Sequence, residues 1–175
     1  MPKIRPGVRK PPPGMDLISE QLDMFEAEMK DAVLNTSCAS PPTSSLPPSA
    51  KRKVETTWPL SSINYRRTRY IYDMCFKHKK ISMELLDYCT SNGWVDGALS
   101  KTWRVPGYET LCCMQCIDPR NTAFKGSCIC RVPHKATSAS SEKGTLQCVA
   151  CGCSGCFSGG SKKKKEGESK RQRDL

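Results

Sequence analysis

Nine cysteines between residues 112 and 156 constrain this chain more than any other feature of its sequence. Three pairs of them are separated by two residues, at 113 and 116, 148 and 151, and 153 and 156. In such a spacing the chain turns back and directs two sulfur atoms at one point, and Gly152 and Gly155 permit the tight turns. Soft thiolates at a tetrahedral site select zinc or, less often, an iron–sulfur cluster. The sequence therefore predicts a metal centre in this segment.

A secreted disulfide scaffold is the alternative explanation of twelve cysteines in 175 residues. Residues 1–14 are basic and rich in proline, and no apolar run follows them, so we expect no secretory signal peptide. No apolar stretch approaches the ~18 residues that a membrane span requires. In a reducing compartment such a density of cysteine usually means metal, which we favour over disulfides.

The number of thiols predicts a trinuclear zinc cluster. Two four-cysteine sites would leave one of the nine cysteines over, whereas three tetrahedral ions need twelve bonds, which six terminal and three bridging thiolates provide. The predicted ligands are Cys112, Cys113, Cys116, Cys128, Cys130, Cys148, Cys151, Cys153 and Cys156. The formal charge of such a cluster is minus three, and basic residues between the ligand groups are expected to offset it: Arg120, Lys125, Arg131 and Lys135. All-thiolate ligation is typical of structural zinc, so we expect no enzymatic activity and no small-molecule substrate.

The other cysteines are not expected to bind the metal. Cys75 and Cys89 fall inside predicted helices, where free cysteine packs as a small hydrophobic residue. Cys38 falls in a linker, and His134 is expected at the surface rather than on the metal.

Hydrophobic periodicity predicts an acidic amphipathic helix over residues 15–34, with Ser19 as its cap. Apolar residues recur there at three- and four-residue steps: Ile18, Leu22, Phe25, Met29 and Val33. This stripe either packs on the chain's own domain or docks on a partner, because helix-in-groove recognition uses the same spacing.

Nine of the twelve aromatic residues lie between Trp58 and Tyr108, so a compact core is expected there. We predict helices over residues 63–80, 82–92 and 96–103, the second of which ends at Gly93. The candidate core residues are Tyr70, Ile71, Met74, Phe76, Leu85 and Leu86.

These patterns predict a mainly α fold with a small irregular zinc–cysteine module. The expected segments are a basic arm (1–14), the acidic helix (15–34), a Ser/Pro linker with a basic motif (35–57), an aromatic helical domain (58–110), the zinc–cysteine module (111–157) and a basic tail (158–175). The arm, the linker and the tail contain too few apolar residues to form a core, so we expect them to be disordered.

An excess of 28 Lys and Arg over 17 Asp and Glu gives a net charge of +11, which favours a polyanionic partner. The expected RNA or partner contacts are Arg66, Arg67, Arg69, Lys77, Lys79 and Lys80. The arginines are expected at the start of the helix over 63–80, where exposed cations are disfavoured by ~0.3–1 kcal/mol each, which points to phosphate contact. After the Ser/Pro linker, a short motif resembles a nuclear import signal: Lys51, Arg52 and Lys53.

The order of several motifs resembles a known family. The motifs are Pro-Pro-Pro-Gly-Met-Asp-Leu-Ile at 11–18, Lys-Arg-Lys-Val-Glu at 51–55, Thr-Arg-Tyr-Ile at 68–71, Gly-Tyr-Glu at 107–109, Leu-Cys-Cys at 111–113 and Cys-Ile-Cys-Arg-Val-Pro at 128–133, followed by the four cysteines of 148–156. Over residues 1–34 and 51–158 the chain is similar to the G-ten family of bud-site-selection splicing factors.

The resemblance implies a small, non-enzymatic, nuclear subunit of the spliceosome, with the family's zinc–cysteine cluster on the nine cysteines named above. It also implies association with the Prp-nineteen-related complex, the large scaffold protein and the small nuclear RNAs. The chain departs from the family's pattern in the linker 35–50, in residues 134–147 and in the basic tail from Ser161 onward.

Two other functions compete with this one. A nuclear zinc-binding transcription regulator would need a recognition helix presented by a metal loop, whereas the segments between the cysteine groups are short or irregular. A redox enzyme would need a reactive, low-pKa thiol near a strand–helix turn.

Overall fold

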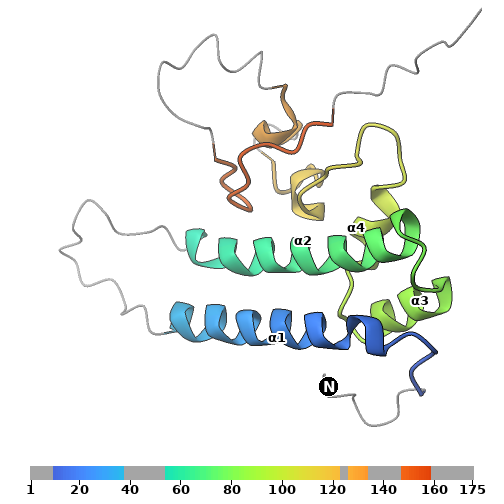
Figure 1. The fold of residues 1–175 in the computed structure, drawn as a ribbon. Helices are drawn as coiled ribbons and strands as arrows, with labels where there is room; N and C mark the ends of the chain where they lie inside the picture. The colour runs from blue at the N-terminus through green and yellow to red at the C-terminus, as the bar shows by residue number, and fades with distance from the viewer. Residues whose placement is uncertain (1–9, 38–53, 123–125, 134–146, 159–175) are drawn as a thin grey trace, which may run out of the picture.

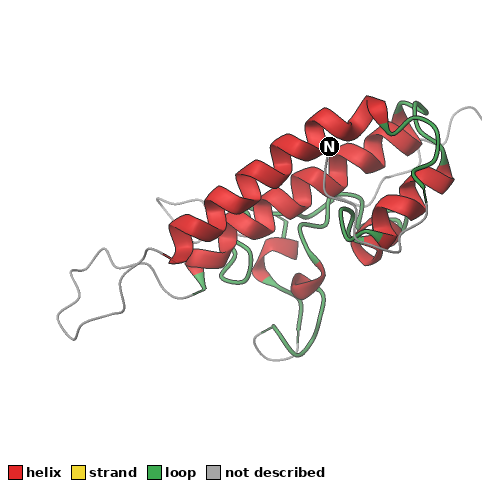
Figure 2. Cartoon of the chain, turned by 90° about the horizontal axis from the view of Figure 1, so that it is seen from below, coloured by secondary structure: helices red, strands yellow, loops and turns green. Residues whose placement is uncertain are grey.

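Helices α1 (Asp16–Ser37) and α2 (Trp58–Tyr72) lie side by side and antiparallel, and the cysteine-bearing segments cover the other side of α2 (Figure 1). The computed structural model describes residues 10–37, 54–122, 126–133 and 147–158. Helices α3 (Met83–Ser91) and α4 (Gly97–Thr102) follow at the end of α2. Within the described residues there is no strand (Figure 2), which confirms the mainly α prediction.

Several predictions fall outside the described residues. They concern the basic arm up to residue 9, the linker from 38 to 53, the tail from 159, and the individual residues Cys38, Lys51, Arg52, Lys53, Lys125, His134 and Lys135.

The acidic helix forms as α1, but its predicted cap was wrong. Ser19 does not cap the helix, because the helix has already begun at Asp16 and the Ser19 hydroxyl donates to the Asp16 carbonyl oxygen at 3.2 Å. Only Met15, Ile18 and Leu22 of this segment join the buried core. Val33, at the other end of the apolar stripe, is 46% exposed, so the stripe extends past that core.

Helix α2 begins at Trp58, earlier than the predicted start at residue 63. A short turn, η1 (Glu55–Thr57), leads directly into it, and Pro59 stands in the first turn, where its fixed φ and missing N–H suit a helix. The arginines at 66, 67 and 69 therefore lie in the second half of α2, and their predicted placement at a helix start was wrong. The helix ends in a π turn, η2 (Asp73–Lys77).

Both short helices are capped by a side chain at the N-terminus. The Ser82 hydroxyl accepts from the Leu85 N–H at 3.3 Å, and an Asp96 carboxylate oxygen accepts from the Leu99 N–H at 3.0 Å. Each bond satisfies one backbone donor of a first helical turn. The helices predicted over 82–92 and 96–103 are confirmed within a residue or two at each end.

Two buried clusters hold the described residues together. One joins α1, α2 and α3 and contains Ile18, Ile71, Leu85 and Cys89, all fully buried. The other joins Leu99, Trp103 and Leu111 to six buried cysteines. Of the other candidate core residues, Leu86 is buried, whereas Tyr70, Met74 and Phe76 are half-buried and pack against the first cluster.

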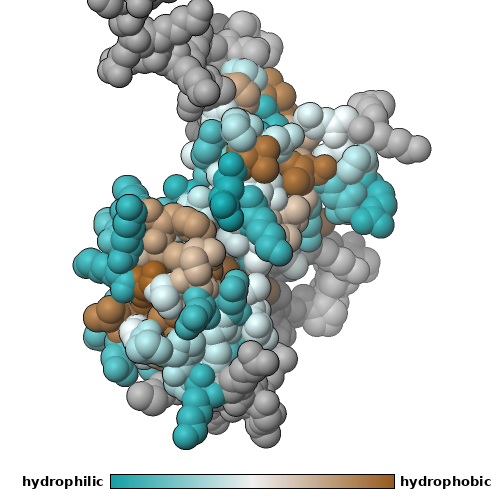
Figure 3. Space-filling view, turned by 90° about the vertical axis from the view of Figure 1, so that its right-hand side faces the viewer, coloured by the Kyte–Doolittle hydropathy of each residue, from teal (hydrophilic) through white to brown (hydrophobic). Residues whose placement is uncertain are grey.

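On the face shown in Figure 3, apolar side chains gather on the helical part and again on the cysteine-bearing part, with hydrophilic side chains between them. None of the described helices is long and apolar enough to cross a bilayer.

Cys75 and Cys89 are buried in the helical cluster, as predicted. Burial raises the pKa of the Cys89 thiol to about 12.

We predict that Cys89→Ser lowers the free energy of unfolding by about 1–3 kcal/mol, because it buries a hydroxyl without a partner. Denaturant titration measures the loss, with Cys89→Ala as the control that lacks the polar group. Metal content is expected to stay unchanged in both variants, and a loss of metal would contradict a purely structural Cys89.

Candidate metal centre

Three short segments bring the nine cysteines together. The Trp103 indole donates to the Leu111 carbonyl oxygen at 2.8 Å and anchors the first segment. The Cys156 N–H donates to the Cys130 carbonyl oxygen at 2.7 Å and joins the third segment to the second. Within the third segment, the Cys148 N–H donates to the Cys153 carbonyl oxygen at 2.9 Å. The sulfur positions therefore depend on a few backbone bonds and on one tryptophan.

The first residue of α2 holds the cysteine loop, residues 147–156. The Trp58 indole donates to the Val149 carbonyl oxygen at 3.1 Å. Gly152 lies against the same ring, so close that a β-carbon there would stand 2.6 Å from a ring carbon. Its φ of 72° is also in the left-handed region that favours glycine. The sequence does not reveal this contact, because the two residues are far apart along the chain.

The nine sulfur atoms form three overlapping groups of four. In each group all Sγ atoms lie within 4.8 Å of one another. The groups are Cys112, Cys130, Cys153 and Cys156; Cys112, Cys113, Cys116 and Cys151; and Cys116, Cys128, Cys130 and Cys148. Three cysteines belong to two groups each, and the other six belong to one. This is the pattern of three bridging and six terminal ligands that the count of nine predicts.

The distances fit tetrahedral metal rather than disulfides. The Sγ–Sγ distance is 3.5 Å between Cys113 and Cys116, 3.8 Å between Cys116 and Cys151, and 3.9 Å between Cys112 and Cys130. A zinc–sulfur bond of ~2.3 Å places two ligands of a tetrahedron ~3.8 Å apart, whereas a disulfide requires ~2.05 Å. All nine thiols are free.

Most of the clustered cysteines are buried. The shared residues Cys112, Cys116 and Cys130 are 9%, 1% and 3% exposed, and the unshared residues Cys148, Cys151 and Cys156 are 0%, 7% and 4% exposed. The half-exposed cysteines are all unshared: Cys113, Cys128 and Cys153. A further group of three, made of Cys148, Cys151 and Cys153, contains unshared members only. The three positions that would bridge two ions are thus all buried, together with half of the positions that would be terminal.

Thiol–thiol contacts and burial raise the pKa of some cysteine thiols in the cluster and lower the pKa of others. A hydrogen bond with the Cys112 thiol holds the pKa of Cys113 well below its usual range, and another lowers the pKa of Cys156 to about 7. Burial raises the pKa of Cys148. Because the metal-binding form of cysteine is the thiolate, protons compete with metal for these sulfurs.

Arg131 is the described cation placed to offset the charge of the cluster. Its guanidinium donates to the carbonyl oxygens of Cys156 and Gly107, both at 2.6 Å, and lies over the Tyr108 ring at 4.6 Å. It also comes within 3.9 Å of the Cys156 sulfur. Arg120, the other described candidate, forms an ion pair with Asp118 at 3.1 Å instead.

The three arginine candidates for RNA or partner contact all have internal partners. Arg66 pairs with Glu28 at 2.5 Å, and Arg67 donates to the Gly93 carbonyl oxygen at 3.2 Å. Arg69 donates to the Glu109 carbonyl oxygen at 2.8 Å and stacks over Trp103 at 5.0 Å. These side chains tie α2 to its neighbours, so only their remaining donor atoms are left for a ligand.

The lysine candidates lie together in an exposed turn. We define the basic turn as Lys77, His78, Lys79 and Lys80, all exposed, together with the exposed Arg104. Arg104 stacks over Phe76 at 5.5 Å, which brings it to this turn. Lys79 has a φ of 53°, a left-handed conformation that glycine favours. Sequence reasoning missed Arg104, because only the fold brings it near the lysines.

Comparison with known proteins identifies close similarity over most of the chain. The family model of the pre-mRNA-splicing factor BUD31 matches residues 1–158. A BUD31 homolog of Branchiostoma belcheri is 40% identical over 156 residues, which cover 89% of this chain and 99% of that protein. The pre-mRNA-splicing factor BUD31 of Saccharomyces cerevisiae is 37% identical over 164 residues, covering 90% and 99%. The pre-mRNA-splicing factor cwf14 of Schizosaccharomyces pombe is 35% identical over 159 residues, with the same coverage.

Gly152→Ala is predicted to loosen the contact between Trp58 and the cysteine loop. The added methyl would collide with the indole ring, which forces the loop or the ring to move. Gly93→Ala is the matched control, because Gly93 has a similar φ of 74° but nothing within 4 Å of the added carbon. We expect Gly152→Ala to lose about 1–3 kcal/mol more than the control in denaturant titration of the metal-loaded chain. Equal losses would mean that backbone strain alone matters there.

Proposed function

This chain belongs to the family of the pre-mRNA-splicing factor BUD31, and we propose that it acts in the nucleus as a non-enzymatic structural subunit of the spliceosome. The family match spans all nine clustered cysteines, and two of the relatives are themselves named pre-mRNA-splicing factors. A closed, all-sulfur site also suits a structural role, because catalytic zinc keeps an open position for water. The names of the relatives favour splicing over the transcription alternative.

The nine cysteines are proposed to hold three zinc ions. The three overlapping groups of four thiols support this count, since each group supplies the four ligands of one tetrahedral ion. Cys112, Cys116 and Cys130 would then bridge pairs of ions, and the six unshared cysteines would be terminal ligands. This division of sulfur atoms is the observation that carries the proposal for the metal.

The metal would stabilise a part of the chain that has little apolar material of its own. The second buried cluster contains only Leu99, Trp103 and Leu111 among its fully buried apolar residues, and the rest of its buried members are cysteines. Bound zinc contributes ~10–16 kcal/mol of folding free energy per site in small zinc domains. Removal of the metal is therefore expected to unfold the cysteine-bearing segments.

The partners are proposed to be small nuclear RNA and spliceosomal proteins, among them the Prp-nineteen-related complex and the large scaffold protein. The basic turn is the best candidate for RNA phosphates, because its cations are exposed and grouped. Arg66, Arg67 and Arg69 are secondary candidates through the donor atoms that their internal partners leave unused. Several exposed apolar side chains suit contacts with protein, among them Val105, Ile129, Val149 and Phe157.

Native mass spectrometry of the full-length chain tests the metal count. We expect a mass that corresponds to three zinc ions. Cys130→Ser removes a ligand from two of the proposed sites and is predicted to reduce occupancy by about two ions. Cys113→Ser removes a ligand from one site and is predicted to cost about one ion. Two metals in the unmodified chain, or equal losses in both variants, would contradict the bridged arrangement.

Lys79→Gly tests the basic turn without the risk of unfolding. Glycine relieves the left-handed conformation at this position, so the helix end is expected to gain about 1 kcal/mol of stability. At the same time the loss of one cation is expected to lower the recovery of small nuclear RNA with the tagged protein from nuclear extract by about threefold or more. Lys30→Gln is the control, because Lys30 pairs with Glu26 on α1. Unchanged RNA recovery in Lys79→Gly would remove this turn from the RNA contact.

A further inference from the structure

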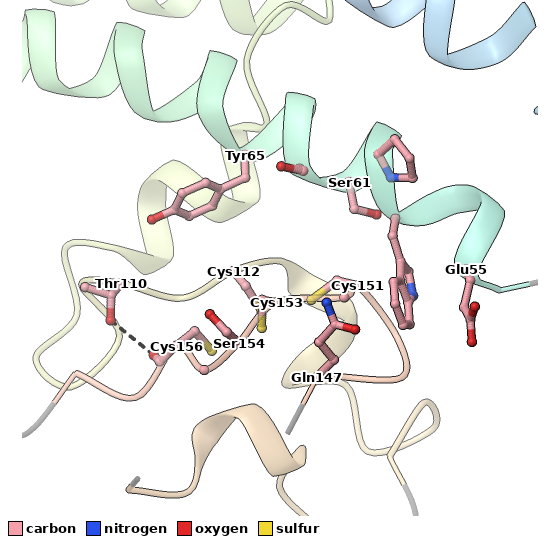
Figure 4. Close-up of a pocket in the computed structure, with 15 residues that line it drawn as sticks. Glu55, Ser61, Tyr65, Thr110, Cys112, Gln147, Cys151, Cys153, Ser154 and Cys156 are labelled. Atoms are coloured by element: carbon pink, nitrogen blue, oxygen red, sulfur yellow. Dashed lines mark hydrogen bonds between the residues drawn. The ribbon is translucent and has the colours of Figure 1, made fainter. Parts of the chain in front are cut away.

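A cleft separates the first half of α2 from the cysteine loop. It has a volume of about 770 Å³, and Figure 4 shows Glu55, Ser61 and Tyr65 on the helix side facing Cys151, Cys153 and Ser154 on the loop side. Thr110 and Cys112 also line the cleft. The cleft is large enough for one long side chain and the backbone that carries it.

The part of the cleft lining that the structure describes contains no cation. None of the described residues around it is lysine, arginine or histidine, and Glu55 is the one charged residue among them. This is unexpected in a chain with 28 Lys and Arg against 17 Asp and Glu. Phosphate groups of nucleic acids are bound mainly by Lys, Arg and backbone N–H groups, so the cleft is a poor site for RNA.

Its walls instead offer groups that accept hydrogen bonds. Serine and tyrosine hydroxyl groups line the helix side, at Ser61, Ser62 and Tyr65. Four cysteines line the other side, and Cys153 among them is half-exposed. With the proposed cluster in place these sulfurs are thiolates, and three zinc ions with nine thiolates carry a formal charge of minus three. The proposed cluster would thus make the cleft electronegative within a protein whose net charge is +11.

We propose that this cleft binds an arginine side chain presented by an extended segment of a partner protein. A guanidinium supplies five N–H donors for the hydroxyl groups and sulfurs, and its flat, weakly hydrated face stacks on aromatic rings such as that of Tyr65. A lysine ammonium is more strongly hydrated and does not stack in this way. The negative charge of the wall formed by the cysteines depends on the proposed zinc cluster. The absence of lysine, arginine and histidine from the described lining does not depend on it.

Titration of the full-length, metal-loaded chain with a short peptide tests the proposal. The probe is acetyl-Gly-Arg-Gly-amide, and the readouts are the NMR signals of the Trp58 indole N–H and the Gly155 amide. We expect saturable shifts with the arginine peptide. The citrulline peptide has the same shape without the charge and is expected to bind about tenfold more weakly. Equal binding of both peptides, or no shift with either, would overturn the proposal.

Two substitutions at Ser62 test whether the arginine peptide binds in the cleft. Ser62 is exposed on α2 and lines the cleft. Ser62→Lys adds a cation there and is expected to weaken binding of the arginine peptide by about tenfold. Ser62→Gln adds similar bulk without charge and is expected to retain most of the affinity for this peptide. If both variants bind the peptide as the unmodified chain does, the peptide binds elsewhere and the proposal fails.

Two further measurements separate the remaining outcomes. The lysines at 162–165 are replaced by glutamine in the full-length chain. If the Trp58 and Gly155 signals move before any peptide is added, the chain's own tail fills the cleft and a partner does not. Zinc is measured on the same samples. If the chain holds three zinc ions but binds no peptide, arginine binding in the cleft is refuted and the proposed cluster is not. If the chain holds no metal, the proposed cluster is refuted as well.

Discussion

Sulfur atoms held 3.3–3.9 Å apart are the constraint on which the second half of this protein depends. Nine thiolates at such distances repel one another strongly unless cations lie between them. Nine protonated thiols would make only weak hydrogen bonds, and in the described parts of the segments that carry them the regular structure consists of two short turns. The proposed metal would make this packing stable, and the proposed bridging arrangement would explain why cysteines from all three segments are needed at once.

Helix α2 connects the cysteine-bearing segments to the helical core. One side of it packs against α1, while Tyr65 and Tyr72 meet Trp103 edge-on at 5.5 and 5.2 Å on the other side. Trp103 in turn bonds to the backbone beside the first ligand segment. Aromatic pairs of this kind contribute about 0.5–1.5 kcal/mol each beyond the area they bury. The metal centre and the helical core thus share one helix, and disorder in one is expected to weaken the other.

The sequence predicts the local features of this fold well and the long-range ones poorly. The helices predicted over 82–92 and 96–103 form because spacing and residue type, which neighbours in sequence determine, specify them. The nine cysteines that the spacing selects as ligand candidates also lie together. The early start of α2 was missed because Pro59 and the serines at 61 and 62 interrupt the periodicity that marks a buried helix. The contact of Trp58 with Gly152 and the position of Arg104 depend on segments that only the complete fold brings together. Such contacts leave no periodic signal in the chain.

The metal proposed to replace a hydrophobic core would also determine what the cleft can recognise. A buried aliphatic cluster would leave Glu55 as the one charged group among the described residues that line the cleft beside α2, whereas nine thiolates that hold three zinc ions would give one of its walls a negative charge. Arg131, which donates to the Cys156 carbonyl oxygen, would compensate part of that charge. The basic turn lies at the far end of α2, so phosphate groups and cationic side chains would be attracted to different ends of one helix. In the proposed arrangement folding and recognition are coupled, because both would depend on the charge of the same sulfur atoms.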